Sequence, residues 1–370
     1  MAWPTKKLGE VLEYEQPTKY LVNSTNYKDE YSTSVLTAGK SFILGKTNEK
    51  NGIFPKEKLP VIIFDDFTTA IKFVDFPFKV KSSAMKILHR KKGKADIRFL
   101  FLKMQTIKFI PKQHKRYWIS EYSNIEIVIP PLKIQKQIVE RLDKIAEAQK
   151  LNDELIQKTD ELFKSLLHQE LNPAGKDWEV KKLGDIAEII GGFAFKSKDL
   201  IDKKLTEEYL PVIKIGNVLK SGDINILNVQ YHKFDNSLEK YLINSGDILV
   251  AMTGATVGKV VSSYTTNLLL NQRVGLIRSR LGLADQSFLG IVLETKMFYE
   301  YCQKTAGGGA QGNISPTQIM LYETILPPPK IQKKIVEKLS AVQEYKKQLL
   351  EQKSKLKELF DSVLSKSMKN

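Results

Sequence analysis

The sequence predicts an α+β protein: two globular domains separated by two long helices that form an antiparallel coiled coil, with an internal pseudo-twofold repeat. Three observations support this. The chain has 370 residues, 42% of them hydrophobic, which is enough for more than one cored domain and excludes wholesale disorder. Two sequence strings each occur twice, and a long uninterrupted helical pattern follows each copy of the second string.

The repeat is visible at two places in each half of the chain. WPTKKLGEVLE, from Trp3, returns as WEVKKLGDIAE, from Trp178, with six of eleven positions identical. PLKIQKQIVERL, from Pro131, returns as PPKIQKKIVEKL, from Pro328, with nine of twelve identical. The offsets are 175 and 197 residues, so the second copy carries 22 extra residues between its two strings. We place this extra material inside the second globular domain.

Each second string opens a segment with apolar residues three, four or seven positions apart, the spacing of one helix face. No glycine or proline interrupts residues 132–170, and Asn172-Pro173 ends the pattern. At about 1.5 Å per residue this helix is roughly 58 Å long and needs a partner to cover its apolar face. We expect the two helices to bury each other through Ile138, Leu142, Ile145, Ala148, Leu155, Leu162 and Leu166 of the first and Ile335, Leu339, Val342, Tyr345, Leu356, Leu359 and Val363 of the second. The alternative is that each helix packs only on its own domain.

The expected organisation is therefore a domain at 1–131, a long helix within 132–172, a second domain at 173–329 and a C-terminal helix at 330–370. Short runs rich in β-branched or aromatic residues predict strands at 61–64, 108–110, 125–129 and 247–252. Residues 287–304 are patterned as a helix inside the second domain.

The charge points to a polyanionic partner. The chain carries a net charge of +16, of which residues 1–131 hold +10 and residues 330–370 hold +6. Basic residues mixed with aromatics suit contacts to DNA phosphates, although such runs are also common on solvated loops. The candidates in the first domain are Lys79, Lys81, Arg90, Lys91, Lys92, His114, Lys115 and Arg116. In the nearly neutral second domain, contacts depend on local clusters that include Lys259, Arg273 and Arg278.

No motif predicts catalysis. The single cysteine, Cys302, and four scattered histidines offer no metal-ligand spacing and no disulfide. Asp65 and Asp66 are adjacent, so on a strand they would point to opposite faces. The glycine-rich run 254–260 lacks the spacing and the Ser/Thr of a phosphate-binding loop. Asp285 with Glu294 and Lys296 has nuclease-like composition but a helical pattern. No membrane span or apolar signal core is present, so we expect a soluble, cytoplasmic protein.

The duplicated layout resembles a known family, the DNA-specificity subunits of type I restriction-modification enzymes. The strings that carry the resemblance span nearly the whole chain. They are Trp-x-x-Lys-Lys-Leu-Gly at Trp3 and Trp178, Gly246-Asp247-Ile248-Leu249 continuing through 253–259, Asn271-Gln272, the run 307–315 and the two Pro-x-Lys-Ile-Gln segments. The family often has Glu-Gln where this chain has Ile134-Gln135 and Ile331-Gln332.

The resemblance implies a non-catalytic subunit in which each domain recognises one half of a bipartite duplex DNA site. The helix pair then fixes the spacing and docks the modification subunits, two by expectation, with the restriction subunits joining the assembled complex. S-adenosylmethionine, ATP and Mg²⁺ belong to those partners, and this chain binds no cofactor and no membrane. With a 58 Å rod and about 3.4 Å per base pair, the separation is limited to about 17 base pairs.

Polar residues in the repeated loops suit base edges in the major groove. Gln311 and Asn313 lie in a glycine-rich loop, and His114 and Arg116 stand 197 positions earlier. Asn271, Gln272 and Arg273, with the similarly placed Ser82 and Ser83, are further candidates. The alternative for these residues is a loop that merely closes the last strand. For the whole chain, the alternatives are a non-specific nucleic-acid-binding coiled-coil scaffold and an enzyme with an unrecognised site.

Overall fold

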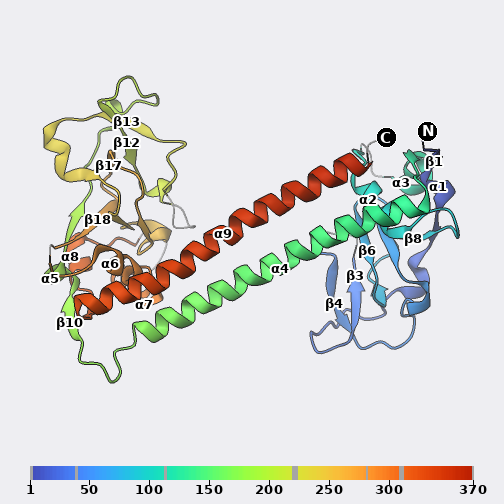
Figure 1. Ribbon diagram of the computed structural model, residues 1–370, viewed down its shortest axis with the longest axis horizontal. Coiled ribbons are helices and arrows are strands. Elements are labelled where there is room, and N and C mark those ends of the chain that lie inside the picture. Colours follow the sequence, from blue (N-terminus) through green and yellow to red (C-terminus); the bar gives the residue numbers. More distant parts are fainter. Residues whose placement is uncertain are drawn as a thin grey trace. The chain divides into compact units, whose positions relative to one another are not determined.

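A computed structural model describes residues 3–37, 41–111, 115–218, 224–280, 282–307 and 312–368. The chain forms two compact units (Figure 1). Unit 1 comprises residues 1–156 and 349–370, and unit 2 comprises residues 157–348. Each long helix therefore begins in one unit and ends in the other. In the described part of the chain, no helix is both long and apolar enough to cross a membrane.

Unit 1 is built on an antiparallel sheet of order β2-β8-β5-β6. A second sheet has the order β4-β3-β7, and β1 pairs with β9. The strands are β1 (Thr5–Lys7), β2 (Leu12–Glu15), β3 (Thr33–Leu36), β4 (Ile43–Thr47), β5 (Val61–Asp65), β6 (Ile71–Val74), β7 (Phe78–Val80), β8 (Met85–Arg90) and β9 (Glu126–Val128). The helices are α1 (Leu8–Val11), η1 (Pro17–Tyr20), η2 (Lys56–Lys58), α2 (Ile97–Gln105), α3 (Tyr117–Ser120) and η3 (Tyr122–Asn124).

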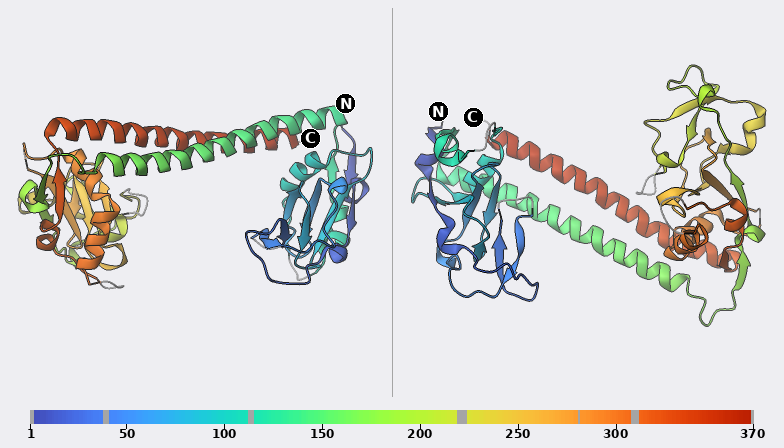
Figure 2. Two further views of the ribbon diagram at one scale, coloured as in Figure 1. Left: turned by 90° about the horizontal axis from the view of Figure 1, so that it is seen from below. Right: turned by 180° about the vertical axis from the view of Figure 1, so that it is seen from behind.

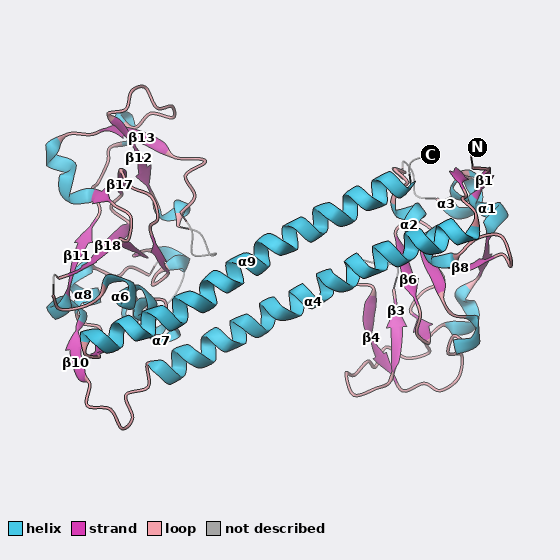
Figure 3. Ribbon diagram, in the orientation of Figure 1, coloured by secondary structure: helices cyan, strands magenta, loops and turns pink. Residues whose placement is uncertain are grey.

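Unit 2 repeats this plan, with sheets of order β11-β18-β15-β16 and β13-β12-β17-β14 and a β10-β19 pair (Figure 3). Its strands are β10 (Glu179–Lys182), β11 (Ala187–Gly191), β12 (Tyr209–Ile213), β13 (Gln230–Lys233), β14 (Leu242–Ile243), β15 (Ile248–Ala251), β16 (Val260–Ser262), β17 (Leu268–Leu270), β18 (Val274–Ser279) and β19 (Glu323–Leu326). Its helices are α5 (Leu183–Ile186), η4 (Ser197–Asp199), η5 (Ile215–Asn217), η6 (Asn236–Tyr241), η7 (Gly254–Thr256), α6 (Gln286–Leu293), α7 (Lys296–Thr305) and α8 (Pro316–Met320).

The expected long helices are α4 (Leu132–Glu170) and α9 (Pro329–Met368). Within each unit the two helix segments run antiparallel, side by side (Figure 2). In unit 1, Gln149 lies opposite Leu356 and Asn152 opposite Leu349. The predicted α+β repeat with paired helices is confirmed.

Two local predictions were wrong. Residues 108–110 form no strand: Phe109 packs its ring on Tyr117 and Tyr122 from a loop, whereas Ile110 is 80% exposed. The helix expected at 287–304 is broken into α6 and α7, because Thr295 caps the second helix by accepting a hydrogen bond from the Phe298 backbone N–H.

Candidate nucleic-acid interface

Four segments far apart in sequence meet at one edge of unit 2, and we call them loop cluster 2. They are Gly192–Phe193, Met252–Gly258, Asn271–Val274 and Gly312–Ile314. The Met252 N–H donates to the carbonyl of Arg273 at 3.0 Å, and the Met252 carbonyl accepts from the N–H of Ile314 at 2.9 Å. Gly254 donates to Gly312 at 2.8 Å. Backbone hydrogen bonds therefore assemble the loops.

Gly192 allows the closest of these approaches. A Cβ atom at this position would lie 2.1 Å from the carbonyl oxygen of Asn271, which no side chain can tolerate. The Gln272 N–H in turn donates to the Phe193 carbonyl at 2.9 Å. The glycine thus fixes where the Asn271–Val274 turn sits.

Loop cluster 2 presents amide and guanidinium groups to solvent. Gln272, Arg273 and Asn313 are exposed and Asn271 is buried, whereas Lys259, which directly follows the second segment, is half-buried. These groups match the donors and acceptors of base edges and phosphates. The structure brings together this part of the predicted set. Gln311 lies outside the described residues.

Unit 1 builds the same arrangement, loop cluster 1, from Asp65–Thr69, Lys81–Ala84 and Arg116–Trp118. The Asp66 N–H donates to the Ala84 carbonyl at 3.2 Å, and the Asp66 carbonyl accepts from the Tyr117 N–H at 2.8 Å. These are the counterparts of the two hydrogen bonds at Met252, and they align Arg116 with Asn313 and Ser83 with Gln272. Lys81, Ser83 and Arg116 are exposed and Ser82 is half-buried. His114 lies outside the described residues.

The adjacent carboxylates of loop cluster 1 are structural. Asp65 accepts hydrogen bonds from the Phe67 N–H at 2.9 Å and the Thr68 hydroxyl at 2.6 Å, closing the turn. Asp66 accepts from the Trp118 N–H at 2.9 Å and lies 3.2 Å from the Lys86 ammonium. Because each carboxylate has its own partners, the pair has no shared site for acid–base chemistry.

Lys79, a predicted DNA contact, is buried instead. Its ammonium lies 2.9 Å from Glu49 and donates to the Asn51 carbonyl at 2.6 Å. The hydrogen bond from Lys79 lowers the pKa of Glu49. This ammonium is held by contacts within the fold, so of the two neighbouring lysines Lys79 is buried and Lys81 is exposed.

A second group of predicted contacts lies away from loop cluster 1. Arg90 is the last residue of β8 and Lys91 and Lys92 follow it, whereas the other end of the strand, at Met85, adjoins the cluster. Six strand residues separate these ends by about 17 Å. Lys91 also donates its side chain to the Gly9 carbonyl at 2.7 Å. The structure therefore does not join this basic run to the loops.

Lys115 lies next to loop cluster 1 with a partner of its own. Its ammonium pairs with Glu121 and sits 5.5 Å from the Tyr117 ring centroid. The hydrogen bond to Glu121 raises the pKa of Lys115. The side chain remains partly open to solvent, so its contact with DNA stays a prediction.

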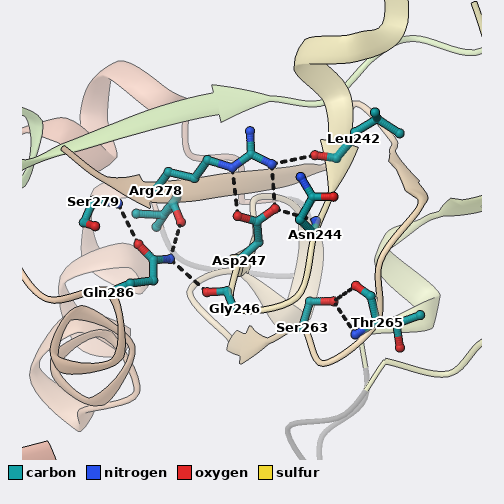
Figure 4. Close-up of polar contacts among 10 residues, drawn as sticks. Leu242, Asn244, Gly246, Asp247, Ser263, Thr265, Arg278, Ser279 and Gln286 are labelled. Carbon is teal, nitrogen blue, oxygen red and sulfur yellow. Dashed lines mark hydrogen bonds and ion pairs between the residues drawn. The ribbon is translucent and has the colours of Figure 1, made fainter. Parts of the chain in front are cut away.

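Arg278 forms a framework contact at the end of β15 and β18 that lies away from loop cluster 2 (Figure 4). Its guanidinium donates to Asp247 at 2.8 and 2.6 Å and to the Leu242 carbonyl at 2.7 Å. The hydrogen bond with Asp247 raises the pKa of Arg278. Gln286 adds a second bridge, accepting from the Ser279 N–H at 2.6 Å. Arg278 belongs to the basic clusters expected to contact DNA, but its guanidinium is bound by Asp247 and Leu242 within the fold.

The residues of the remaining enzyme-like motifs have packing and helix-capping roles. Gly258 has a positive φ of 79°, and a Cβ there would meet the Cys302 side chain at 2.6 Å, so this glycine serves packing. Asp285 caps the start of α6 by accepting from the Phe288 N–H at 2.9 Å, whereas Glu294 lies at the other end of that helix. Among the described residues, no group of three or more His, Cys, Asp or Glu side chains could hold a metal ion.

Near the start of each long helix the residues predicted for the helix–helix interface are buried. Farther along the helices, the buried face differs from the predicted one. Leu142, Ile335 and Leu339 are fully buried, and Ile138 is 8% exposed. Ile145, Ala148, Leu166, Val342, Leu356 and Val363 are half-buried. Leu155, Leu162, Tyr345 and Leu359, by contrast, are 43–50% exposed. In the middle of α4 the buried positions are instead Asn152 and Thr159, which keep the three- and four-residue spacing from Leu142.

Polar contacts occupy this middle portion. In unit 1, Asn152 donates to the Leu349 carbonyl at 2.9 Å, and Lys353 pairs with Asp153 at 2.8 Å. In unit 2, Lys346 pairs with Asp160 at 2.6 Å. The Asn152 Oδ1 atom has no hydrogen-bond partner among the described residues. A search for apolar periodicity could not find these positions, because their side chains are polar.

Comparison with known proteins accords with this architecture. A model of the type I restriction modification DNA specificity domain matches residues 2–159 and 175–358. Over 196 residues, half of the chain, the sequence is 45% identical to the EcoR124I/EcoR124II specificity subunit of Escherichia coli, and this match spans 48% of that relative. Over 397 aligned residues it is 24% identical to the MjaVIII specificity subunit of Methanocaldococcus jannaschii, covering 99% of this chain and 91% of that one.

Two solved structures share the fold. The S subunit of a type I restriction-modification system from M. genitalium has a TM-score of 0.65 and 14% identity, covering 100% of this chain and 96% of its own. The HsdS subunit of Thermoanaerobacter tengcongensis has a TM-score of 0.52 and 19% identity, covering 99% and 96%.

Proposed function

Because the chain belongs to the family of type I restriction-modification DNA specificity subunits, which are non-catalytic recognition subunits, we propose that loop clusters 1 and 2 each read one half of a bipartite duplex DNA site. The observation that carries this proposal is the shared scaffold of the clusters. Equivalent backbone hydrogen bonds, at Asp66 in unit 1 and at Met252 in unit 2, hold loops that differ in their exposed side chains.

The exposed side chains give the two clusters different chemistry. Gln272 and Asn313 offer amides that match adenine in the major groove, and Arg273 matches guanine or a phosphate. Loop cluster 1 instead offers the Ser83 hydroxyl with the cations Lys81 and Arg116. The two half-sites therefore differ in sequence, and unit 1 draws more of its affinity from phosphates.

The helix pair sets the separation of the half-sites in this proposal. A continuous helix such as α4, with 39 residues, is about 58 Å long and is stiffer than a flexible linker. At about 3.4 Å per base pair, this length limits the separation to about 17 base pairs.

We infer the partner subunits from the family and from apolar side chains that the fold leaves exposed. The chain binds DNA and assembles with other restriction-modification subunits. We assign two modification subunits to the helix pair, and the restriction subunits join through the assembled complex. S-adenosylmethionine, ATP and Mg²⁺ are expected on these partner subunits and not on this chain. Leu151 and Leu162 on α4 and Leu350 on α9 are 49–53% exposed. In unit 2, a cavity of about 890 Å³ lined by residues such as Phe163, Leu167 and Ile325 adds apolar surface.

The test is selection of bound duplexes from a random DNA pool, followed by footprinting of the selected sequence. We expect two short protected patches with an unprotected gap, and maps of methylated adenine in the host should give the same bipartite sequence. Sequence-independent binding that falls steeply with salt would instead favour the non-specific scaffold. Methyl transfer by the isolated chain would favour an enzyme.

A further inference from the structure

One buried glutamine stands at the start of each long helix. Gln135 is the fourth residue of α4 and Gln332 the fourth of α9, and both are only 1% exposed. They end the repeated Pro-x-Lys-Ile-Gln strings. A fully buried carboxamide is costly unless both its oxygen and its nitrogen find partners, so its contacts indicate its role.

The two side chains make the same pair of hydrogen bonds to the same structural elements. In unit 1, Gln135 Oε1 accepts from the Asp96 N–H at 2.7 Å, and Nε2 donates to the Pro130 carbonyl at 2.7 Å. In unit 2, Gln332 Oε1 accepts from the Asp285 N–H at 2.8 Å, and Nε2 donates to the Pro327 carbonyl at 2.7 Å.

In each unit, the two hydrogen-bond partners of the glutamine lie on two different structural elements. Asp96 and Asp285 are the N-caps of α2 and α6, each accepting a hydrogen bond from a backbone N–H three residues on at 2.9 Å. The prolines lie on the segment that leads into the long helix. One side chain thus joins the long helix to its own leading segment and to the helix that packs on the sheet.

This contact is directional, whereas the apolar packing around it is not. Two hydrogen bonds to a planar carboxamide fix both the position and the angle of the joined backbones. Unit 1 also has an Arg98–Asp143 pair at 2.8 Å between α2 and α4, but the glutamine contact is made identically in both units. The pattern is that of a fixed joint between each domain and its helix.

We propose that Gln135 and Gln332 are positioning residues that hold each DNA-reading domain at a set angle on its helix, so that the spacer between half-sites is read strictly. This inference rests on the proposed function. It assigns base recognition to the loop clusters and spacer discrimination to the two joints.

The test measures binding of the full chain to its selected bipartite duplex and to duplexes whose spacer is one base pair longer or shorter. Gln135→Met keeps the side-chain volume but removes both hydrogen bonds. We expect the preference for the native spacer over its neighbours to fall about fivefold or more, as for the loss of a net hydrogen bond. The preferred bases in both half-sites should not change.

Matched variants keep the proposal falsifiable. Gln137→Met alters an exposed glutamine two residues away and should leave spacer preference unchanged. Gln332→Met tests the same joint independently in unit 2, and Gln135→Glu retains the acceptor for Asp96 if the methionine variant fails to fold. A preference that stays intact, or binding that weakens equally for all three spacers, would overturn the proposal and show a purely structural role. Failure of the proposed function would differ, because the wild-type chain would then select no bipartite sequence.

Discussion

Units 1 and 2 share a backbone scaffold but stabilise it with different charged groups. Unit 1 buries Lys79 against Glu49 and Lys86 against Asp66, both at 1% exposure of the lysine. Unit 2 uses the partly exposed Arg278–Asp247 pair, at the end of β15 and β18 away from its loops. The loop arrangement common to both units therefore depends on main-chain hydrogen bonds. The buried and partly buried ion pairs, by contrast, differ between the two units.

The largest effect is expected at Asp66. Asp66→Ala leaves the buried Lys86 ammonium without its carboxylate and removes the acceptor for the Trp118 N–H. Unfolding in urea should show a loss of about 3–5 kcal/mol. The buried Met252 holds the equivalent position in unit 2 without such a pair, so the volume-conserving Met252→Leu should cost less, no more than about 1.5 kcal/mol. A loss below about 1 kcal/mol for Asp66→Ala would contradict the buried pair.

A smaller effect is expected at Glu49, and it depends on pH. The folded-state pKa of Glu49 is lowered from its ordinary value of 4.5 by the hydrogen bond from Lys79. Its stabilisation is therefore present above about pH 4.5 and is lost as pH falls through the lowered value. Glu49→Gln should cost about 2 kcal/mol at pH 7, and the gap from wild type should close in acid. A gap that persists unchanged at low pH would exclude the ionised pair as the cause.

Base recognition should separate the two units. Gln272→Ala should reduce discrimination at one position of a single half-site by about 1–2 kcal/mol, or about tenfold, because one amide contact is lost. Ser83→Ala, at the equivalent position, should affect only the other half-site. Competition binding with singly substituted duplexes measures both. Altered preference in both half-sites from one substitution would refute the division between the units.

The smallest change in stability is expected on the open face of the helix pair. Leu162→Ser replaces a half-exposed side chain and should alter unfolding free energy by no more than about 0.5 kcal/mol. The fully buried Leu142, changed to Ala, should cost about 2–5 kcal/mol. Thermal unfolding gives both values. Pull-down with the modification subunit should weaken for Leu162→Ser, and unchanged capture would argue that the partner docks elsewhere.

The sequence predicted the architecture well, because repetition and long periodic segments survive in the fold. Both copies of the Pro-x-Lys-Ile-Gln string open long helices, and the 197-residue offset aligned Arg116 with Asn313. The middle of the helix pair was missed because its buried positions include Asn152 and Thr159. Burial of Lys79 could not be foreseen either, because its partner Glu49 lies 30 residues away.

The basic run at Arg90, Lys91 and Lys92 shows the limit of composition. Charge density in a sequence carries no information about which end of a strand faces the loops, and β8 places this run at the end distant from loop cluster 1. The Arg278–Asp247 contact was hidden for a similar reason, since it joins a residue of β18 to the residue before β15, 31 positions away in the sequence.

The main-chain bonding at Asp66 and Met252 has an evolutionary consequence. A scaffold held by backbone hydrogen bonds tolerates replacement of the exposed side chains beside it. New recognition sequences can therefore arise by point mutation while the domain still folds. Under the proposed function, either domain can change its half-site while the other keeps its own, so the duplicated chain can combine old and new specificities.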